Sequence, residues 1–336
     1  DADGDGLQDL FIGARSIPGN YGAAPSSVLL RNQGKGNFAD VTRQMAPALQ
    51  QLGMVTAARW AVLQPNAAPT LVVAGDWMPL LFFQFSNGRL TQTGQIENSR
   101  GWWNNIEVAD LDNNGLPEII ALNRGLNSKI QADSLHPAHL YVGDFDNNGQ
   151  PECLPAYYKS DGKLYPYPLR GDLAMQVPSF KKKFLYYADY AGKTIDQVLT
   201  SDQIKAARLL TVTESRSMIY RQTAPGRFEP QPLPVDAQLS DMYAVLVADL
   251  NHDGLSDLVL AGNCFGLKPE TGRYDASEGL VFVNRGNRSF EYLPPRLSGF
   301  RTPGEVKQVL RLSIAGSNHL LVGRNNDSLQ LFRLTP

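Results

Sequence analysis

One acidic pattern, repeated four times, constrains the fold of this 336-residue chain more than any other feature. It reads D-x-[DN]-x-[DN]-G-x-x-[DE], and its copies are "DADGDGLQD" from Asp1, "DLDNNGLPE" from Asp110, "DFDNNGQPE" from Asp144 and "DLNHDGLSD" from Asp249. An alternating apolar run precedes each copy for which sequence exists, and a short apolar run follows each one. The pattern therefore predicts a strand, an acidic turn and a second strand.

A second element also recurs. Four segments combine two alternating runs with a polar Gly/Asn turn, which predicts β-hairpins. The same place in the four hairpins is taken by Phe38, Leu90, Phe228 and Phe290. Acidic turn and hairpin together form a unit of roughly 45 to 60 residues with four short strands, a period typical of a propeller blade.

Counting the candidate inner strands predicts the number of blades. Six are visible, near Arg59, Val108, Val142, Leu210, Val247 and Leu310. A seventh is expected upstream of residue 1, because the chain starts inside the motif. We therefore expect an all-β fold, a seven-bladed β-propeller forming a single domain over residues 1–336. Asp110 and Asp144 are too close for a full blade between them, so a short third blade is expected. The pattern turns helical around residues 172–207, which predicts a short helical insertion.

The acidic turns have the oxygen-rich composition that Ca²⁺ prefers. They carry 13 of the 33 acidic residues, so the rest of the chain has 20 acids against 31 bases. Crowded carboxylates repel one another unless a cation neutralises them, and Ca²⁺ takes six to eight oxygens. The alternative is that the Asn, Asp and Gly residues only bend the chain. Four copies with one ligand order favour up to four Ca²⁺ ions, and the early closing acid followed by a strand excludes an EF-hand.

The predicted ligands occupy positions 1, 3, 5, 7 and 9 of each turn, position 7 through its carbonyl. They are Asp1, Asp3, Asp5, Leu7 and Asp9; Asp110, Asp112, Asn114, Leu116 and Glu118; Asp144, Asp146, Asn148, Gln150 and Glu152; and Asp249, Asn251, Asp253, Leu255 and Asp257.

These segments resemble FG-GAP/VCBS repeats, the calcium-loop blades of integrin α-subunit propellers and of ASPIC/UnbV-type bacterial relatives. The resemblance covers most of the chain and is strongest at the four acidic turns. It implies a seven-bladed propeller with Ca²⁺ in the loops, located in the periplasm, at the cell surface or in a secreted protein. The chain departs from the family pattern at Asn114, Asn148 and Asn251, which predicts weaker sites.

Two stretches are candidates for a ligand surface. "RGWWNN" contains Trp102 and Trp103, which could stack on a sugar. Adjacent strand residues face opposite ways, so one tryptophan is expected in the core and one free. A long polar connection offers Arg273, Tyr274 and Asp275, where an Arg–Asp pair that pins the loop is the alternative.

The remaining sequence favours a binding module over an enzyme. Nucleophile-elbow, zinc-protease and phosphate-loop motifs are missing. A net charge of −2 gives no reason to expect a nucleic-acid partner, and no apolar run is long enough for a membrane span. We expect a monomeric domain of a larger chain with a protein or glycan partner. The alternatives are a carbohydrate-active enzyme, such as a propeller polysaccharide lyase, and a structural spacer of an envelope protein.

Overall fold

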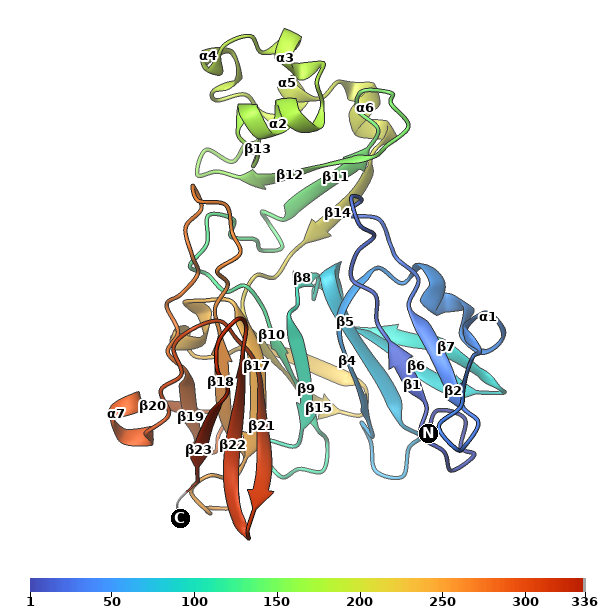
Figure 1. Cartoon of the computed structure of the whole chain (residues 1–336), viewed down its shortest axis with the longest axis vertical. Helices are drawn as coiled ribbons and strands as arrows, with labels where there is room; N and C mark the ends of the chain where they lie inside the picture. Colours follow the sequence, from blue (N-terminus) through green and yellow to red (C-terminus); the bar gives the residue numbers. More distant parts are fainter. Residues whose placement is uncertain (335–336) are drawn as a thin grey trace.

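The structure is a computed structural model that describes residues 1–334, and it is built mostly of antiparallel β-sheets. Five sheets follow one another in a row, and a sixth projects from one side of that row together with most of the helices (Figure 1). We number the five sheets of the row I to V in chain order and call the sixth the inserted sheet.

The sheets of the row are antiparallel meanders of three to five strands. Sheet I contains β1 (Leu10–Ile12), β2 (Val28–Asn32) and β3 (Phe38–Asp40). Sheet II contains β4 (Met54–Ala61), β5 (Thr70–Met78), β6 (Leu81–Ser86) and β7 (Arg89–Gln95), and β8 (Gly101–Trp102) pairs with β5. Sheet III contains β9 (Asn105–Ala109), β10 (Glu118–Leu122), β15 (Met218–Ala224) and β16 (Arg227–Pro232). Sheet IV contains β17 (Met242–Ala248), β18 (Asp257–Gly262), β19 (Leu280–Asn284) and β20 (Phe290–Leu293). Sheet V contains β21 (Val306–Ile314), β22 (Ser317–Arg324) and β23 (Gln330–Arg333).

Neighbouring sheets pack face to face. The first strands β4, β9, β17 and β21 contact one another in that order. Separate apolar clusters fill the space between sheets I and II, II and III, III and IV, and IV and V. Strands β10, β18 and β19 are consequently buried along their whole length, since both faces of their sheets are covered.

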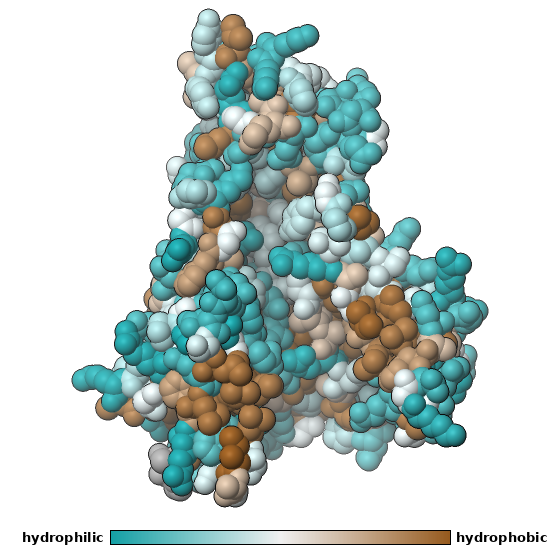
Figure 2. All heavy atoms as spheres, in the orientation of Figure 1, coloured by the Kyte–Doolittle hydropathy of each residue, from teal (hydrophilic) through white to brown (hydrophobic). Residues whose placement is uncertain are grey.

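The end sheets of the row are less completely covered. Sheet V exposes Leu310 and Ile314 of β21 and Leu331 of β23, and Figure 2 shows an apolar patch over these strands. At the other end, Leu10 and Ile12 of β1 are exposed. Both end sheets have three strands, whereas sheets III and IV have four.

The inserted sheet interrupts sheet III. The chain leaves after β10, forms the insertion and returns at β15, which pairs directly with β10. The insertion contains β11 (Ala138–Gly143), β12 (Glu152–Tyr158), β13 (Leu164–Pro166) and β14 (Arg208–Val212), with α2 (Arg170–Gln176), α3 (Phe180–Lys183), α4 (Tyr187–Tyr190), α5 (Ile195–Val198) and α6 (Ser201–Ala206). These helices confirm the predicted helical segment. They cover one face of the inserted sheet through a cluster that includes Tyr141, Leu173 and Val198.

The short remaining helices lie in connections. They are α1 (Thr42–Met45), α7 (Pro295–Ser298) and the 3₁₀ helices η1 (Pro47–Gln51) and η2 (Val235–Gln238). Within residues 1–334, no helix has the length and apolar character needed to cross a membrane.

The structure does not confirm seven blades. Val142 in β11 and Leu210 in β14 lie in paired strands of one sheet, so the count of inner strands included that sheet twice. The turn from Asp144 connects β11 to β12 of the inserted sheet, which explains its short distance from Asp110 without a short blade. The four predicted hairpins are confirmed as β2–β3, β6–β7, β15–β16 and β19–β20.

Candidate metal centre

The four acidic loops share one backbone conformation. Three of them join paired antiparallel strands, β9 to β10, β11 to β12 and β17 to β18, and the first leads into β1. Position 6 is a glycine with a φ between 82° and 87° in every copy. Position 4 is also left-handed and is occupied by Gly4, Asn113, Asn147 and His252. These two positions form the sharp bend that only glycine and a few polar residues adopt at low cost.

Hydrogen bonds inside each loop hold the acids at positions 1 and 9. The carboxylate at position 1 accepts from the N–H of the position 6 glycine, at 2.8 to 3.0 Å in all four copies. The carboxylate at position 9 accepts from the N–H of position 2, at 2.7 to 2.9 Å. The loop therefore curls around its own acids.

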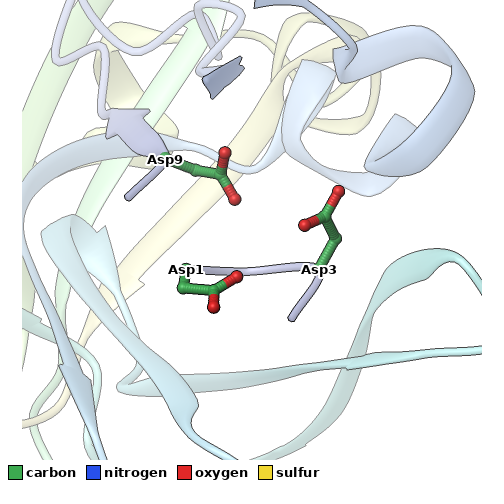
Figure 3. Close-up of side chains that lie close together, drawn as sticks. All are labelled: Asp1, Asp3 and Asp9. Carbon is green, nitrogen blue, oxygen red and sulfur yellow. The ribbon is translucent and has the colours of Figure 1, made fainter. Parts of the chain in front are cut away.

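This curl brings three acids together in three of the loops. Ligand oxygens lie within 4.8 Å of one another in the groups Asp1, Asp3 and Asp9; Asp110, Asp112 and Glu118; and Asp144, Asp146 and Glu152. Figure 3 shows the three carboxylates of the first group around a common space. Two oxygens bound to one Ca²⁺ at about 2.3 to 2.6 Å from it are separated by up to ~5 Å, so the spacing fits one ion. In the fourth loop, Asn251 replaces the acid at position 3.

The predicted ligands at position 5 also brace the turn. Each side-chain oxygen accepts a hydrogen bond from the N–H of position 7, at 2.7 to 2.9 Å. These residues are Asp5, Asn114, Asn148 and Asp253. The clustered group of the first loop does not include Asp5. Carbonyl ligation by Leu7, Leu116, Gln150 and Leu255 stays a prediction.

Glu118 is the most constrained acid of the four loops. Its side chain is 0% exposed, and Oε2 accepts from the N–H of Leu111 at 2.7 Å. Oε1 is buried without a hydrogen-bond partner among residues 1–334. Burial raises the pKa of Glu118 to about 7, with a further rise from Asp112 and a partial offset from the Leu111 N–H and Arg221. A buried carboxylate oxygen with no donor is rare, because the cost of desolvation is not recovered.

Two other acids at position 9 also have a raised pKa. Burial raises the pKa of Glu152 and of Asp257. Neighbouring acids of the same loop raise it further, Asp144 and Asp146 for Glu152, and Asp249 and Asp253 for Asp257. The pKa of Asp144 is lowered, mainly by the N–H of Gly149.

Two arginines that sequence reasoning missed face the acids at position 3. Arg31 in β2 places Nε 2.6 Å from Asp3 and Nη2 3.0 Å from Asp5. Arg221 in β15 is buried, with Nη1 3.9 Å from Asp112. Each arginine lies on a strand that is distant in sequence from its acidic loop. No local sequence pattern could therefore predict these contacts.

Two asparagines join an acidic loop to the hairpin of the same sheet. Their backbone N–H donates to the position 9 acid at 2.8 Å, and their Nδ2 donates to the carbonyl of position 8 at 3.0 to 3.1 Å. The pairs are Asn32 with Asp9 and Gln8, and Asn284 with Asp257 and Ser256. The sequence signal was the Asn-x-Gly shared by "NQG" and "NRG" at the hairpin turns.

Both candidate tryptophans are buried, although one was expected to be free. Trp103 is 0% exposed, and its Nε1 donates to the carbonyl of Ser99 at 2.8 Å. Trp102 is 2% exposed, because Arg124 lies 4.6 Å above its ring and the inserted sheet packs against it. The indole rings are therefore not open for stacking on a sugar.

In the polar connection, Tyr274 and Arg273 have separate partners. Tyr274 pairs through its backbone with Cys264, and the Arg273 guanidinium lies 5.0 Å from the Phe265 ring. No Arg273–Asp275 ion pair occurs in the described part of the chain. The loop is instead held by an ion pair of 2.6 Å between Lys268 and Asp172 of the insertion.

A second charged cluster lies at the start of β17, at the opposite end of that strand from the acidic loop 249–257. Asp241 is 5% exposed, and burial raises its pKa to about 6 against the opposing effect of Arg124 and Lys307. Asp76 accepts from Arg15 at 2.9 Å. A cavity of about 530 Å³ beside this region is lined by Ser16 to Tyr21 and by Asn148, Gln150 and Glu152 of the third acidic loop.

Comparison with protein-family models gives no match for this sequence, and comparison with curated proteins gives no significant match.

Proposed function

We propose that this chain is a calcium-binding β-propeller that acts as a non-enzymatic binding module outside the cytosol. The observation that carries the calcium assignment is the unpartnered Oε1 of the buried Glu118, in a group with Asp110 and Asp112. A hard cation held by oxygens would give this atom its missing partner. Ca²⁺ suits the site better than Mg²⁺, which keeps more of its own water.

The propeller assignment is supported by the arrangement of the sheets. The first strands of sheets II to V lie side by side, as the inner strands of propeller blades do. The acidic loops of sheets III and IV follow those first strands and contact each other. The FG-GAP/VCBS resemblance also implies calcium at the joints between strands.

A location outside the cytosol is consistent with the ligand sets. Asparagine replaces an acid in three of the four loops. Fewer charged ligands weaken a site toward the range of about 10⁻⁴ to 10⁻³ M that extracellular calcium modules use. Sites of this strength are filled only where calcium is abundant.

We propose that a protein or glycan partner binds where Arg15, Arg124 and Lys307 lie, near the start of β17. A lyase would need such basic residues and a metal in one pocket. Asp241 and Tyr243 lie at the start of β17, whereas the loop 249–257 follows its end. A strand of seven residues spans roughly 20 Å, so the loop 249–257 could not supply the metal, whereas the loop 144–152 lines the cavity beside the cluster.

Calorimetric titration of the chelator-treated chain with Ca²⁺ tests the proposal. We expect saturable binding that Glu118→Gln weakens at least tenfold at its own site, because the amide cannot balance the ion's charge. Glu97→Gln, at an exposed position, is the matched control. The absence of saturable binding by the unmodified chain would overturn the calcium assignment.

A screen of the calcium-loaded chain against glycan and protein arrays tests the binding module. Calcium-dependent capture without turnover supports it. Release of unsaturated products from polyuronates would instead identify a lyase, and the absence of any captured partner would favour a spacer.

A further inference from the structure

The loops 110–118 and 249–257, which belong to different sheets, are bonded directly to each other. Asn113 Nδ2 donates to the carbonyl of Gly254 at 2.8 Å. Asn284 Nδ2, at the end of β19, donates to the carbonyl of Leu111 at 2.8 Å and to that of Ser256 at 3.1 Å. Asn284 therefore holds backbone groups of both loops.

In each of these hydrogen bonds, one of the two partners also donates its backbone N–H to a candidate ligand. The N–H of Leu111 donates to Glu118 at 2.7 Å. The N–H of Gly254 donates to Asp249 at 3.0 Å, and the N–H of Asn284 donates to Asp257 at 2.8 Å. Ordering one loop thus fixes backbone groups that position the carboxylates of the other.

We propose that these two loops bind their cations with positive cooperativity, an inference that rests on the calcium binding proposed above. The first ion orders the shared contacts, so the second ion binds to a loop that is already partly ordered. Charge acts in the opposite direction, because filling one loop reduces the negative potential at the other. At 0.15 M salt, screening over about 8 Å limits this opposing effect.

The coupling is specific to this pair. Within residues 1–334, the loops 1–9 and 144–152 make no comparable hydrogen bond to another acidic loop. Asn147 occupies position 4 of the loop 144–152, with a φ of 60° against 59° for Asn113. Asn147 therefore provides a matched comparison with the same backbone and no partner loop.

Nuclear magnetic resonance can follow the two loops separately in one sample. The amides of Gly115 and Gly254 each donate to the position 1 carboxylate of their own loop, so their shifts report its occupancy. We expect Asp249→Asn, which disables the loop 249–257, to weaken Ca²⁺ binding at Gly115 by about fivefold, the lower end for coupled sites. Reciprocity requires Asp110→Asn to weaken binding at Gly254 by the same factor.

Asn113→Gly keeps the left-handed backbone and removes the bond to Gly254. We expect it to reduce the fivefold factor to less than twofold, and Asn147→Gly to leave the factor unchanged. Equal affinity at Gly115 with and without Asp249→Asn would overturn the coupling while leaving calcium binding intact. If neither glycine of the unmodified chain responds to Ca²⁺, the proposed function itself fails and the coupling fails with it.

Discussion

Asn284 in sheet IV donates its Nδ2 to the carbonyl of Leu111 in sheet III, across 173 residues of sequence and 2.8 Å of space. The Asn284 side chain is almost fully buried, and its Oδ1 accepts from the N–H of Gly286 at 3.0 Å. One asparagine thus connects two acidic loops and the turn of a hairpin.

Asn284→Ala is expected to destabilise the chain by about 2 kcal/mol or more, because it leaves buried backbone carbonyls without donors. Chemical denaturation in saturating Ca²⁺ measures the change in the free energy of unfolding. Asn318→Ala, at an exposed position in β22, is the control and should change it by less than about 0.5 kcal/mol. Equal stabilities of the two variants would show that Asn284 does not hold the loops.

Removal of calcium is expected to lower the melting temperature. An ion that binds only the folded state at 100 times its dissociation constant stabilises that state by about 2.7 kcal/mol per site. Differential scanning calorimetry with excess Ca²⁺ and with excess chelator measures the shift, and restoring Ca²⁺ should reverse it. An identical melting temperature in both conditions would contradict the metal assignment.

Arg31→Gln is expected to strengthen Ca²⁺ binding at the loop 1–9 by about two- to fivefold, since exposed ion pairs have modest energies. The arginine competes with a cation for Asp3 and Asp5. The gain should shrink in 1 M salt, where charges are screened. Arg43→Gln, an exposed arginine in α1, is the comparison. Weaker calcium binding by Arg31→Gln would mean that the arginine positions Asp3 instead of competing.

Asp241→Asn is expected to change how stability depends on pH. Burial raises the pKa of Asp241 from 3.8 to about 6 in the folded state. The stabilising contribution of the protonated acid is therefore fully present below about pH 4 and is lost as pH rises through 6. Relative to the unmodified chain, Asp241→Asn should be more stable at pH 7.5 than at pH 4.5.

Denaturation curves at both pH values, in saturating Ca²⁺, measure that difference. The groups that face Asp241 are Arg124, Lys307, Tyr243 and Asp76, and they are the same in both proteins. Asp236→Asn, in η2, is the control for the loss of one acidic residue. A larger relative stability of Asp241→Asn at pH 4.5 would contradict a raised pKa of Asp241 in the folded state.

The local parts of the metal site could be predicted from the sequence. Glycine at position 6 and Asx residues elsewhere in the turn fix a bend that depends on a few neighbouring residues. The apolar runs on both sides then determine the strands. Glu118, Glu152 and Asp257 accordingly begin the strands β10, β12 and β18.

Contacts between distant segments could not be predicted. Arg221 reaches Asp112 only because β15 pairs with β10. The inserted sheet has the same sequence pattern of strand, acidic turn and strand as the sheets of the row. From the sequence alone, its acidic loop could therefore not be distinguished from the acidic loop of a further blade. Trp102 is buried because Arg124 and the inserted sheet cover it, and neither is adjacent in sequence.

The pairing of Ile119 with Tyr220 has a consequence for how the chain is made. As the polypeptide emerges from the ribosome, β9 and β10 appear early, but their sheet stays half-built until the whole insertion has followed. During that interval the apolar edge of β10 is uncovered, and at 5 to 20 residues per second the roughly 100 missing residues take about 5 to 20 seconds. A nascent chain stalled within the insertion would therefore expose an unpaired strand edge, the kind of surface that makes folding intermediates prone to aggregation.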